Sequence, residues 1–522
     1  MIRAALVCFS VLCAVGCSGS AEQWKAKLPD LGLSSSKGEK ATLLSELEPG
    51  PYQPSTVAIG EEKDLARQRS QPFGFVRQAR VEEFLSGIRA RLLAVSGKTG
   101  VPGQVRIVAS QEFNAYSTAD GNVYVSMRCI EEFENLDEVA AILAHEISHV
   151  LLTHHSADLF ADVQHRGRAL YELGLDTKNL LNDKKKPSKG DRQGRDTAET
   201  VVRVTDKLVL PAWTRRQENE ADLLGVDLLV DAGYSPVSMI SMLEKLRASE
   251  RTDEERNKAL LARLQETGDQ SWQEKGRVIY KEILDRVAVN HPKTEERIND
   301  TAAYLERHYG NRNLPEPTVG PWKALVGRPD VKQVMTNYKL AFSAQATLEN
   351  GKSQDAYATA KKAAAGPTLS DAYPNVILSR AAAAVGHHPE ALSALVRAVN
   401  AKEPVAPLYE ELIDVNERSG HIKEALGWAD KASGVFADDP QWRPHKIRLL
   451  RKAGRVAEAT IITKECALKT PDWKGLCERA NRTSRRARFA QLAYPWPRRG
   501  NRSRVGNGSG RPISKKSDSP AD

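Results

Sequence analysis

The chain has 522 residues, more than one compact domain usually holds, so we expect several structural units. Its formal net charge is +9. Arginines and lysines beyond residue 485 supply much of this excess, so the charge gives no support to specific nucleic-acid binding by the folded parts. After the first twenty residues no stretch approaches the length of apolar sequence that a membrane-spanning helix needs.

The first residues look like a bacterial export signal. Residues 1–3 give a positive start, and residues 4–15 form an apolar run of the length of a signal core. The run ends in Ala14-Val15-Gly16-Cys17, which is similar to a lipobox except that Ala14 stands where leucine is usual. We predict a lipoprotein signal over residues 1–17, ending at a lipidated Cys17, with ordinary secretory cleavage as the alternative. Ser18 suits sorting to the outer membrane, and residues 18–59 are expected to be a linker.

The motif His145-Glu146-Ile147-Ser148-His149 lies in a segment, residues 136–153, that is expected to be one largely buried helix. At helical spacing the two histidines share a face and Glu146 projects beside them. Two imidazoles can hold zinc, which lowers the pKa of a bound water to about 7, and the carboxylate can accept its proton. A pair of structural histidines is the alternative, but burying these groups without a ligand is costly.

A third ligand should come from another helix. Glu218 and Asp222 are placed to share one helix face within residues 215–225. Glu218 could therefore bind the metal while Asp222 orients a ligand histidine from behind. Taken alone this spacing is common on solvated helix faces, so the assignment depends on the order of motifs along the chain.

Five blocks of sequence carry that order. They are Asn114-Ala115-Tyr116, residues 120–126, the HExxH motif followed by His155, residues 218–225, and residues 232–236. In this order they resemble the zinc endopeptidases grouped with the CAAX prenyl protease and the HtpX heat-shock peptidase. The closest likeness is to the soluble periplasmic branch typified by the β-barrel assembly-enhancing protease, which also carries tetratricopeptide repeats.

The resemblance implies a zincin-type α+β metallopeptidase over residues 60–310. It implies one zinc ion and gives a role to five residues of the site. The ligands would be His145, His149 and Glu218. Glu146 would be the general base, and Asp222 would orient a ligand from behind. In the same family an edge strand receives the substrate as an added strand, and the resemblance implies that Asn114, Ala115 and Tyr116 form this strand here. An Asp-Gly turn independently predicts a β-hairpin between Tyr116 and Met127.

Other peptidase segments leave alternatives open. His291 lies in an Asn-His-Pro element that looks like one of the same family, and the resemblance implies a fourth ligand or a latch; a polar surface residue is the alternative. The oxyanion could be stabilised by His291 or by Arg297. Residues 182–200 interrupt the peptidase and could be a lid, although a simple surface insertion is the favoured interpretation.

Beyond residue 330 the chain is rich in alanine and repeats about every 34 residues. Small residues recur where a turn is expected, at Gly351, Gly386, Gly420 and Gly454. An acid and an alanine follow each glycine, and the alanines are Ala356, Ala391, Ala425 and Ala459. Pro367, Pro404, Pro440 and Pro471 close the units. The pattern predicts tetratricopeptide-like repeats over residues 331–480, stacked into a solenoid whose concave side binds a partner.

The cysteines and the end of the chain complete the prediction. Cys466 and Cys477 are close enough in sequence to staple the last helical pair, whereas Cys129 is expected to be a small buried apolar residue. Residues 485–522 are basic and rich in glycine, serine and proline, so they should be disordered. Weak contact with anionic lipid and simple solvation are both open for them.

Together these features predict a mainly α protein with an α+β zincin-type peptidase followed by a helical solenoid. The predicted function is a zinc-dependent endopeptidase of the bacterial envelope. It would be periplasmic and lipid-anchored to the outer membrane, or soluble, and would cleave misfolded or stalled polypeptides. The repeats would recruit substrate or a partner such as the outer-membrane assembly machinery. The alternative is a chaperone or assembly adaptor with a mainly structural zinc site, but such a site has no need of Glu146.

Overall fold

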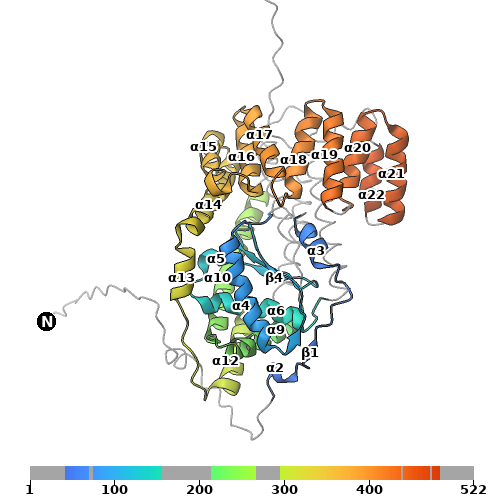
Figure 1. Ribbon diagram of the computed structural model, residues 1–522. Helices are drawn as coiled ribbons and strands as arrows, with labels where there is room; N and C mark the ends of the chain where they lie inside the picture. The colour runs from blue at the N-terminus through green and yellow to red at the C-terminus, as the bar shows by residue number, and fades with distance from the viewer. Residues whose placement is uncertain are drawn as a thin grey trace, which may run out of the picture.

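The computed structural model describes residues 41–69, 74–155, 213–265, 294–436, 439–470 and 473–482. These residues form a lower unit of helices around a small sheet and an upper row of helices (Figure 1). The prediction of a mainly α protein with an α+β part is confirmed. Cys17, the insert 182–200, His291 and the tail 485–522 lie outside the described residues. No helix within the described ranges is long and apolar enough to cross a membrane.

A three-stranded sheet lies inside the lower unit. Its strands, in the order in which they pair, are β3 (Val105–Val108), β5 (Val123–Ser126) and β4 (Ala115–Ser117). β3 runs parallel to β5, and β4 runs antiparallel to β5, which confirms the predicted hairpin. In its turn Gly121 has a φ of 75°, a conformation that glycine adopts without strain. A separate parallel pair is formed by β1 (Gly50–Pro51) and β2 (Lys98–Thr99).

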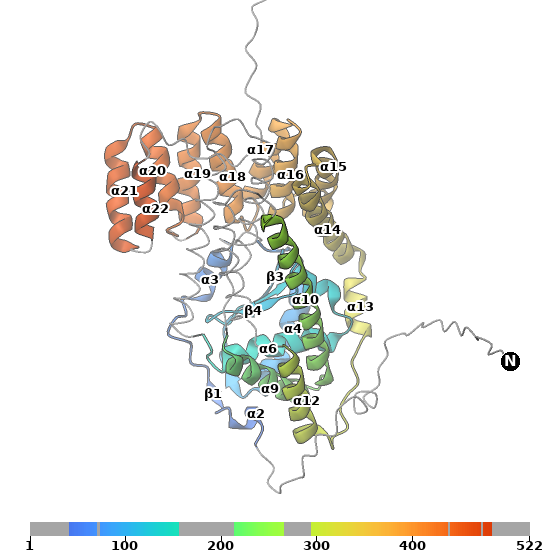
Figure 2. The same cartoon turned by 180° about the vertical axis from the view of Figure 1, so that it is seen from behind.

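Helices surround this sheet. In chain order they are α2 (Leu43–Glu46), α3 (Glu61–Gln68), α4 (Ala79–Val95), α5 (Met127–Glu132), α6 (Leu136–Leu151), α9 (Arg215–Asp231), α10 (Val237–Gln265), α12 (Thr294–Tyr309) and α13 (Gly320–Val326). Seen from behind, the long α10 runs from the level of α12 toward the helical row (Figure 2). The apolar faces of α4, α6 and α9 pack with the inner side of the sheet into one large core.

The helix α6 carries the HExxH motif and is buried along almost its whole length. It begins where predicted, because the side chain of Asn135 accepts a hydrogen bond from the Glu138 N–H and caps the first turn. It ends two residues earlier than predicted. Thr153 has a φ of 54°, which is outside the helical region, so the chain leaves the helix after Leu151.

The short helix α3 connects the hairpin to the helical row. Its buried Asp64 accepts hydrogen bonds of 2.8 Å from three hairpin side chains, those of Thr118, Asn122 and Tyr124. At the end of the same helix, the carbonyl of Arg69 accepts a hydrogen bond of 3.0 Å from the Ala406 N–H. The guanidinium of Arg69 lies 5.9 Å from the ring centre of Phe436. One helix therefore contacts both units.

The upper row consists of successive helix pairs followed by a last helix. They are α14 (Pro329–Glu349) with α15 (Ser353–Ala363), α16 (Ala372–Ala384) with α17 (His388–Val399), α18 (Ala406–Arg418) with α19 (Ile422–Val435), α20 (Trp442–Lys452) with α21 (Val456–Lys469), and α22 (Lys474–Arg482). The four predicted turn glycines have positive φ between the helices of each pair. The four predicted alanines are all buried on the second helix. The helical pairs are thus where the sequence pattern placed them.

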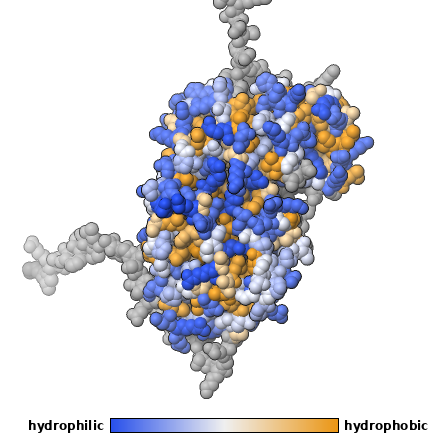
Figure 3. Space-filling model, viewed as in Figure 1, coloured by the Kyte–Doolittle hydropathy of each residue, from blue (hydrophilic) through white to orange (hydrophobic). Residues whose placement is uncertain are grey.

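Cysteines and exposed apolar residues distinguish the end of this row. Cys466 and Cys477 form a disulfide that joins α21 to α22, as the sequence allowed, and Cys129 is buried with a free thiol. Several exposed large apolar side chains gather on α21, namely Val456, Ile461 and Leu468. Hydrophobic residues are visible at this end of the row in Figure 3.

Candidate metal centre

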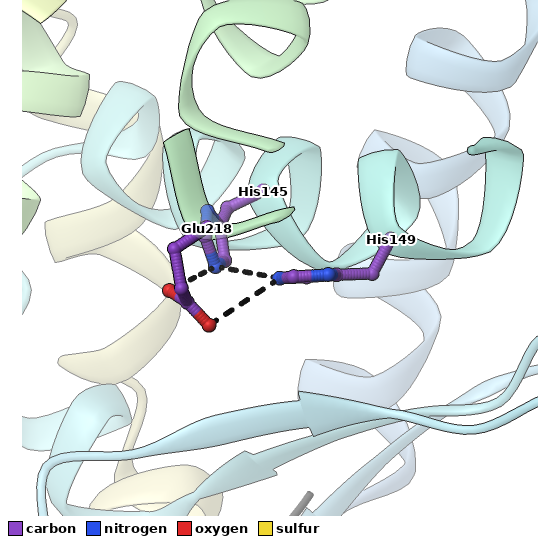
Figure 4. A group of neighbouring side chains, drawn as sticks. All are labelled: His145, His149 and Glu218. Carbon is purple, nitrogen blue, oxygen red and sulfur yellow. Dashed lines mark hydrogen bonds and ion pairs between the residues drawn. The ribbon is translucent and has the colours of Figure 1, made fainter. Parts of the chain in front are cut away.

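Three side chains from two helices converge at the centre of the lower unit (Figure 4). His145 and His149 project from one face of α6, and Glu218 comes from the first turn of α9. The Nε2 atoms of the two histidines are 3.2 Å apart. The Glu218 carboxylate oxygens lie 3.7 Å from His145 Nε2 and 3.8 Å from His149 Nε2. The structure thus brings together the three residues predicted as ligands.

The donor set fits one zinc ion. Two imidazole nitrogens and one carboxylate are a usual protein ligand set for catalytic zinc. Tetrahedral ligands at the usual zinc distances would be about 3.3 Å apart, close to the separations seen here. All three side chains are buried, and within the described residues they are the group of ligand-type side chains that could hold a metal ion.

Glu146 lies beside the ligands on α6 and is buried. Its Oε2 atom has no hydrogen-bond partner among the described residues. Burial raises the pKa of the Glu146 carboxyl to about 7, and the charge of Glu218 adds to this effect while His145 opposes it. A carboxyl group with this pKa can both accept and release a proton near neutral pH.

Asp222 and Arg297 form a buried ionic network behind the ligands. The Asp222 Oδ1 atom lies 2.8 Å from His145 Nδ1, so Asp222 fixes the imidazole with Nε2 toward the ligand position. Arg297 Nε and Nη2 donate hydrogen bonds of 2.7 and 2.8 Å to Asp222. Its Nη1 lies 2.7 Å from Glu218 Oε2. The role predicted for Asp222 fits this geometry.

This network changes the interpretation of Arg297. All three guanidinium nitrogens contact the carboxylates of Asp222 and Glu218, so the described contacts favour a positioning role over contact with an oxyanion. Burial opposes the charge of Arg297, yet the two carboxylates raise its pKa above the usual value. Burial would raise the pKa of Asp222, but Arg297 and His145 lower it. The ionised network is therefore the stable form.

A different set of groups supports His149. The ring of Trp213 stacks on it with centres 4.3 Å apart. Its Nδ1 lies 2.9 Å from Nδ1 of His154, and His154 Nε2 lies 3.4 Å from a carboxylate oxygen of Glu220. Burial lowers the pKa of His149 well below its usual value, and His145 and His154 lower it further. Sequence reasoning missed Trp213 and His154, although the pair of histidines after the HExxH helix was a visible signal.

The predicted substrate strand lies next to this site. β4 begins at Ala115, and Asn114 precedes it with its carbonyl accepting a hydrogen bond of 3.0 Å from the Ser126 N–H. Tyr116 turns to the other face of the sheet, where its hydroxyl donates a hydrogen bond of 3.0 Å to Gln68. Within the described residues β5 is the one strand that pairs with β4, so β4 is at the sheet edge as predicted.

A buried HExxH helix, a glutamate from a second helix and a neighbouring strand edge define the site of a zinc-type metallopeptidase. Residues 78–304 match the family model described as Peptidase family M48. This part of the chain is therefore similar to a family of zinc-dependent metallopeptidases, and the resemblance seen in the sequence is confirmed.

Several curated proteins are similar to the chain over this region. The Beta-barrel assembly-enhancing protease of Escherichia coli (strain K12) is 25% identical, over 37% of this chain and 39% of its own length. The protein of that name from Yersinia pestis is 26% identical, over 42% and 40%. The Mitochondrial metalloendopeptidase OMA1 of Schizosaccharomyces pombe is 24% identical, over 32% and 44%. The chain thus spans less than half the length of these relatives.

Proposed function

We propose that the protein is a zinc-dependent endopeptidase of the bacterial envelope that cleaves unfolded or misfolded polypeptides. The observation that carries the proposal is the buried Glu146 carboxyl beside a three-ligand site. A site that served only to stabilise the fold would have no use for an unpaired carboxyl oxygen at this position. The M48 family match and the relatives named as proteases support the same reaction class.

The residues of the chain divide the chemical work. When bound, the metal supplies Lewis acidity that polarises the scissile carbonyl and makes water a stronger acid. Glu146 accepts the proton from the attacking water and returns it to the departing nitrogen, which its pKa of about 7 permits. Asp222 keeps His145 oriented, and Arg297 holds the carboxylates of Asp222 and Glu218 in place.

The substrate would bind as an extended strand on the free edge of β4. Main-chain hydrogen bonds position such a strand with little demand on its side chains. The enzyme would then accept chains that expose extended backbone, and folded proteins would be excluded because their backbone groups are already paired. One site could then act on many unfolded sequences.

The helical row would recruit the substrate or a protein partner. We assign its pairs to tetratricopeptide repeats, because turn glycines and buried alanines recur at the expected period. The row is fixed to the peptidase by ion pairs, including Arg106 with Glu403 at 2.8 Å and Arg77 with Asp371 at 2.6 Å. A relative is named for β-barrel assembly, so the outer-membrane assembly machinery is the partner we propose. Lipidation of Cys17 would anchor the protein to that membrane.

Cleavage of β-casein by the purified mature protein tests the peptidase proposal, with zinc measured in every sample. Wild type should cut, whereas Glu146→Gln should bind zinc and lose at least about a hundredfold in rate, the size of a general-base contribution. His291→Ala should cut faster if His291 is a latch. Zinc-loaded wild type that does not cut, with cellular function retained by Glu146→Gln, would favour the adaptor alternative instead.

A further inference from the structure

The two sides of β4 make different hydrogen bonds. Thr118 N–H donates to the Asn122 carbonyl and Ser126 N–H donates to the Asn114 carbonyl, each at 3.0 Å. Residues 114, 116 and 118 therefore direct their backbone groups toward β5. In an antiparallel pair the intervening residues direct theirs away, so the backbone groups of Ala115 and Ser117 face the open edge. A substrate strand would pair with these two residues.

One of the backbone groups that face outward already has a hydrogen-bond partner. The Nε2 atom of His155 lies 3.1 Å from the Ser117 carbonyl oxygen, and because a carbonyl only accepts, Nε2 carries the proton and donates. The imidazole thus lies where the N–H of a pairing strand would otherwise be. No hydrogen bond to the Ala115 backbone from the open side is present among the described residues.

His155 is held firmly in this position. It is 7% exposed, and its ring packs edge-on against Trp213 with centres 4.8 Å apart. Its own carbonyl accepts a hydrogen bond from the Ser55 hydroxyl. Burial lowers the pKa of His155 to about 4, although the Ser117 carbonyl opposes this shift, so the imidazole is neutral at pH 7. The contact is thus built from four separate positions of the chain, residues 55, 117, 155 and 213.

The occupied carbonyl lies close to the reacting groups. Ser117 is fully buried, and β4 packs against α6. Glu146 lies on α6, so β4 packs against the helix that carries the general base. A substrate strand that stopped at this point would therefore be fixed in register relative to Glu146.

We propose that His155 is a positioning residue that ends the strand template at Ser117 and thereby sets the register of the substrate. The inference rests on the proposed strand addition and names the residue that limits it. Ala115 pairs with the substrate through both its N–H and its carbonyl. Ser117 cannot form the equivalent pair, because the His155 imidazole bars the approaching strand. Without this limit a substrate could pair along the whole edge in more than one register.

Hydrogen exchange at single amides tests the proposal without catalysis. The full-length Glu146→Gln protein is loaded with zinc and mixed with β-casein, and mass spectrometry with electron-transfer fragmentation follows the edge amides. β-Casein should slow exchange at Ala115 about fivefold to tenfold and leave Ser117 unchanged. In His155→Ala, which has neither the donor nor the ring, Ser117 should become protected as well.

Two further variants provide controls. His155→Gln keeps a donor at a similar reach and should behave as the parent does, while His421→Ala changes an exposed histidine of the helical row and should change nothing. With Glu146 restored, His155→Ala should cut β-casein at more positions, whereas His155→Gln should keep the wild-type positions.

The outcomes distinguish the limit that His155 sets at Ser117 from the binding of the substrate as an added strand. Protection of the Ser117 amide while His155 is present would overturn the proposal, and that arm needs no folded His155→Ala protein. Unchanged exchange and cleavage positions in a folded His155→Ala protein would overturn it too. Protection at neither amide would overturn strand addition and this inference with it, while β-casein cleavage would still decide whether the site is a peptidase.

Discussion

The peptidase domain and the helical row bury different kinds of side chain. The interior of the peptidase includes a cluster of ionisable groups that are at most 6% exposed, namely His145, Glu146, His149, Glu218, Asp222 and Arg297. The interior of the row is built on alanines that let the helices approach closely. Buried charge is costly unless it is paired. A change in the peptidase interior should therefore affect stability and metal binding together, and a change in the row should affect stability alone.

Loss of the buried arginine should have the largest effect. Arg297→Met leaves Asp222 and Glu218 close together without their cation, so the free energy of unfolding of the metal-free protein should fall by about 3–5 kcal/mol. Zinc should recover part of this loss, because it restores positive charge and binds the folded state. Urea denaturation with and without zinc measures both effects.

The matched control is an arginine of the row. Arg455 pairs with Glu458, and both side chains are about half exposed, so Arg455→Met should leave the unfolding curve almost unchanged. Equal losses in the two variants would contradict the contrast between the regions.

Acidification should also act mainly on the peptidase. Burial lowers the pKa of His155 to about 4, whereas in the unfolded chain the value is about 6.5. The unfolded state therefore binds more protons between these values, and the free energy of unfolding falls as pH falls from about 6.5 to about 4. The contribution of His155 is about 3 kcal/mol. His155→Gln should show a shallower pH dependence in urea denaturation, and parallel curves would refute this assignment.

Removal of the disulfide should destabilise the end of the row. Cys466 and Cys477 close a short loop, so replacing both with serine should lower the free energy of unfolding of the row by about 3 kcal/mol. Zinc content should stay at one ion per chain, because the bond lies in the other region. A reductant should reproduce the effect in wild type and have none in the double variant. Loss of zinc from the double variant would contradict the separation of the two regions.

Overpacking the alanine core should have the smallest effect. Ala425 is fully buried between helices of the row, so Ala425→Leu should lower the free energy of unfolding by about 2 kcal/mol. Ala457 is exposed on α21, and Ala457→Leu should change the free energy of unfolding by less than about 0.5 kcal/mol. Thermal unfolding compares the two, with zinc content again unchanged. An equal effect of both would show that the row has no tightly packed core at Ala425.

Much of the site could be predicted because its residues follow local rules. The HExxH spacing places His145 and His149 on one face of a helix, and the spacing of Glu218 and Asp222 does the same on α9. The turn glycines and the hairpin were also recognisable, since each has a short sequence signal. The resemblance to a family supplied the connection between α6 and α9 that no local pattern contains.

The supporting contacts could not be predicted, because they join residues far apart in the sequence. Arg297 belongs to α12, and only the packed structure shows it between Asp222 and Glu218. The stacking of Trp213 on His149 is equally invisible, since neither residue has a periodic relation to the other. The end of α6 was predicted two residues too late because apolar residues continue to Leu152, up to the turn at Thr153.

The helix α3 has a consequence for how this protein could be recombined with its relatives. Asp64 holds the hairpin that bears the proposed substrate edge, and Arg69, at the end of the same helix, contacts the helical row. The two regions are therefore not interchangeable modules joined by a passive connection. A chimera that exchanged the row would have to carry a matching version of residues 60–77, or the hairpin would lose its support.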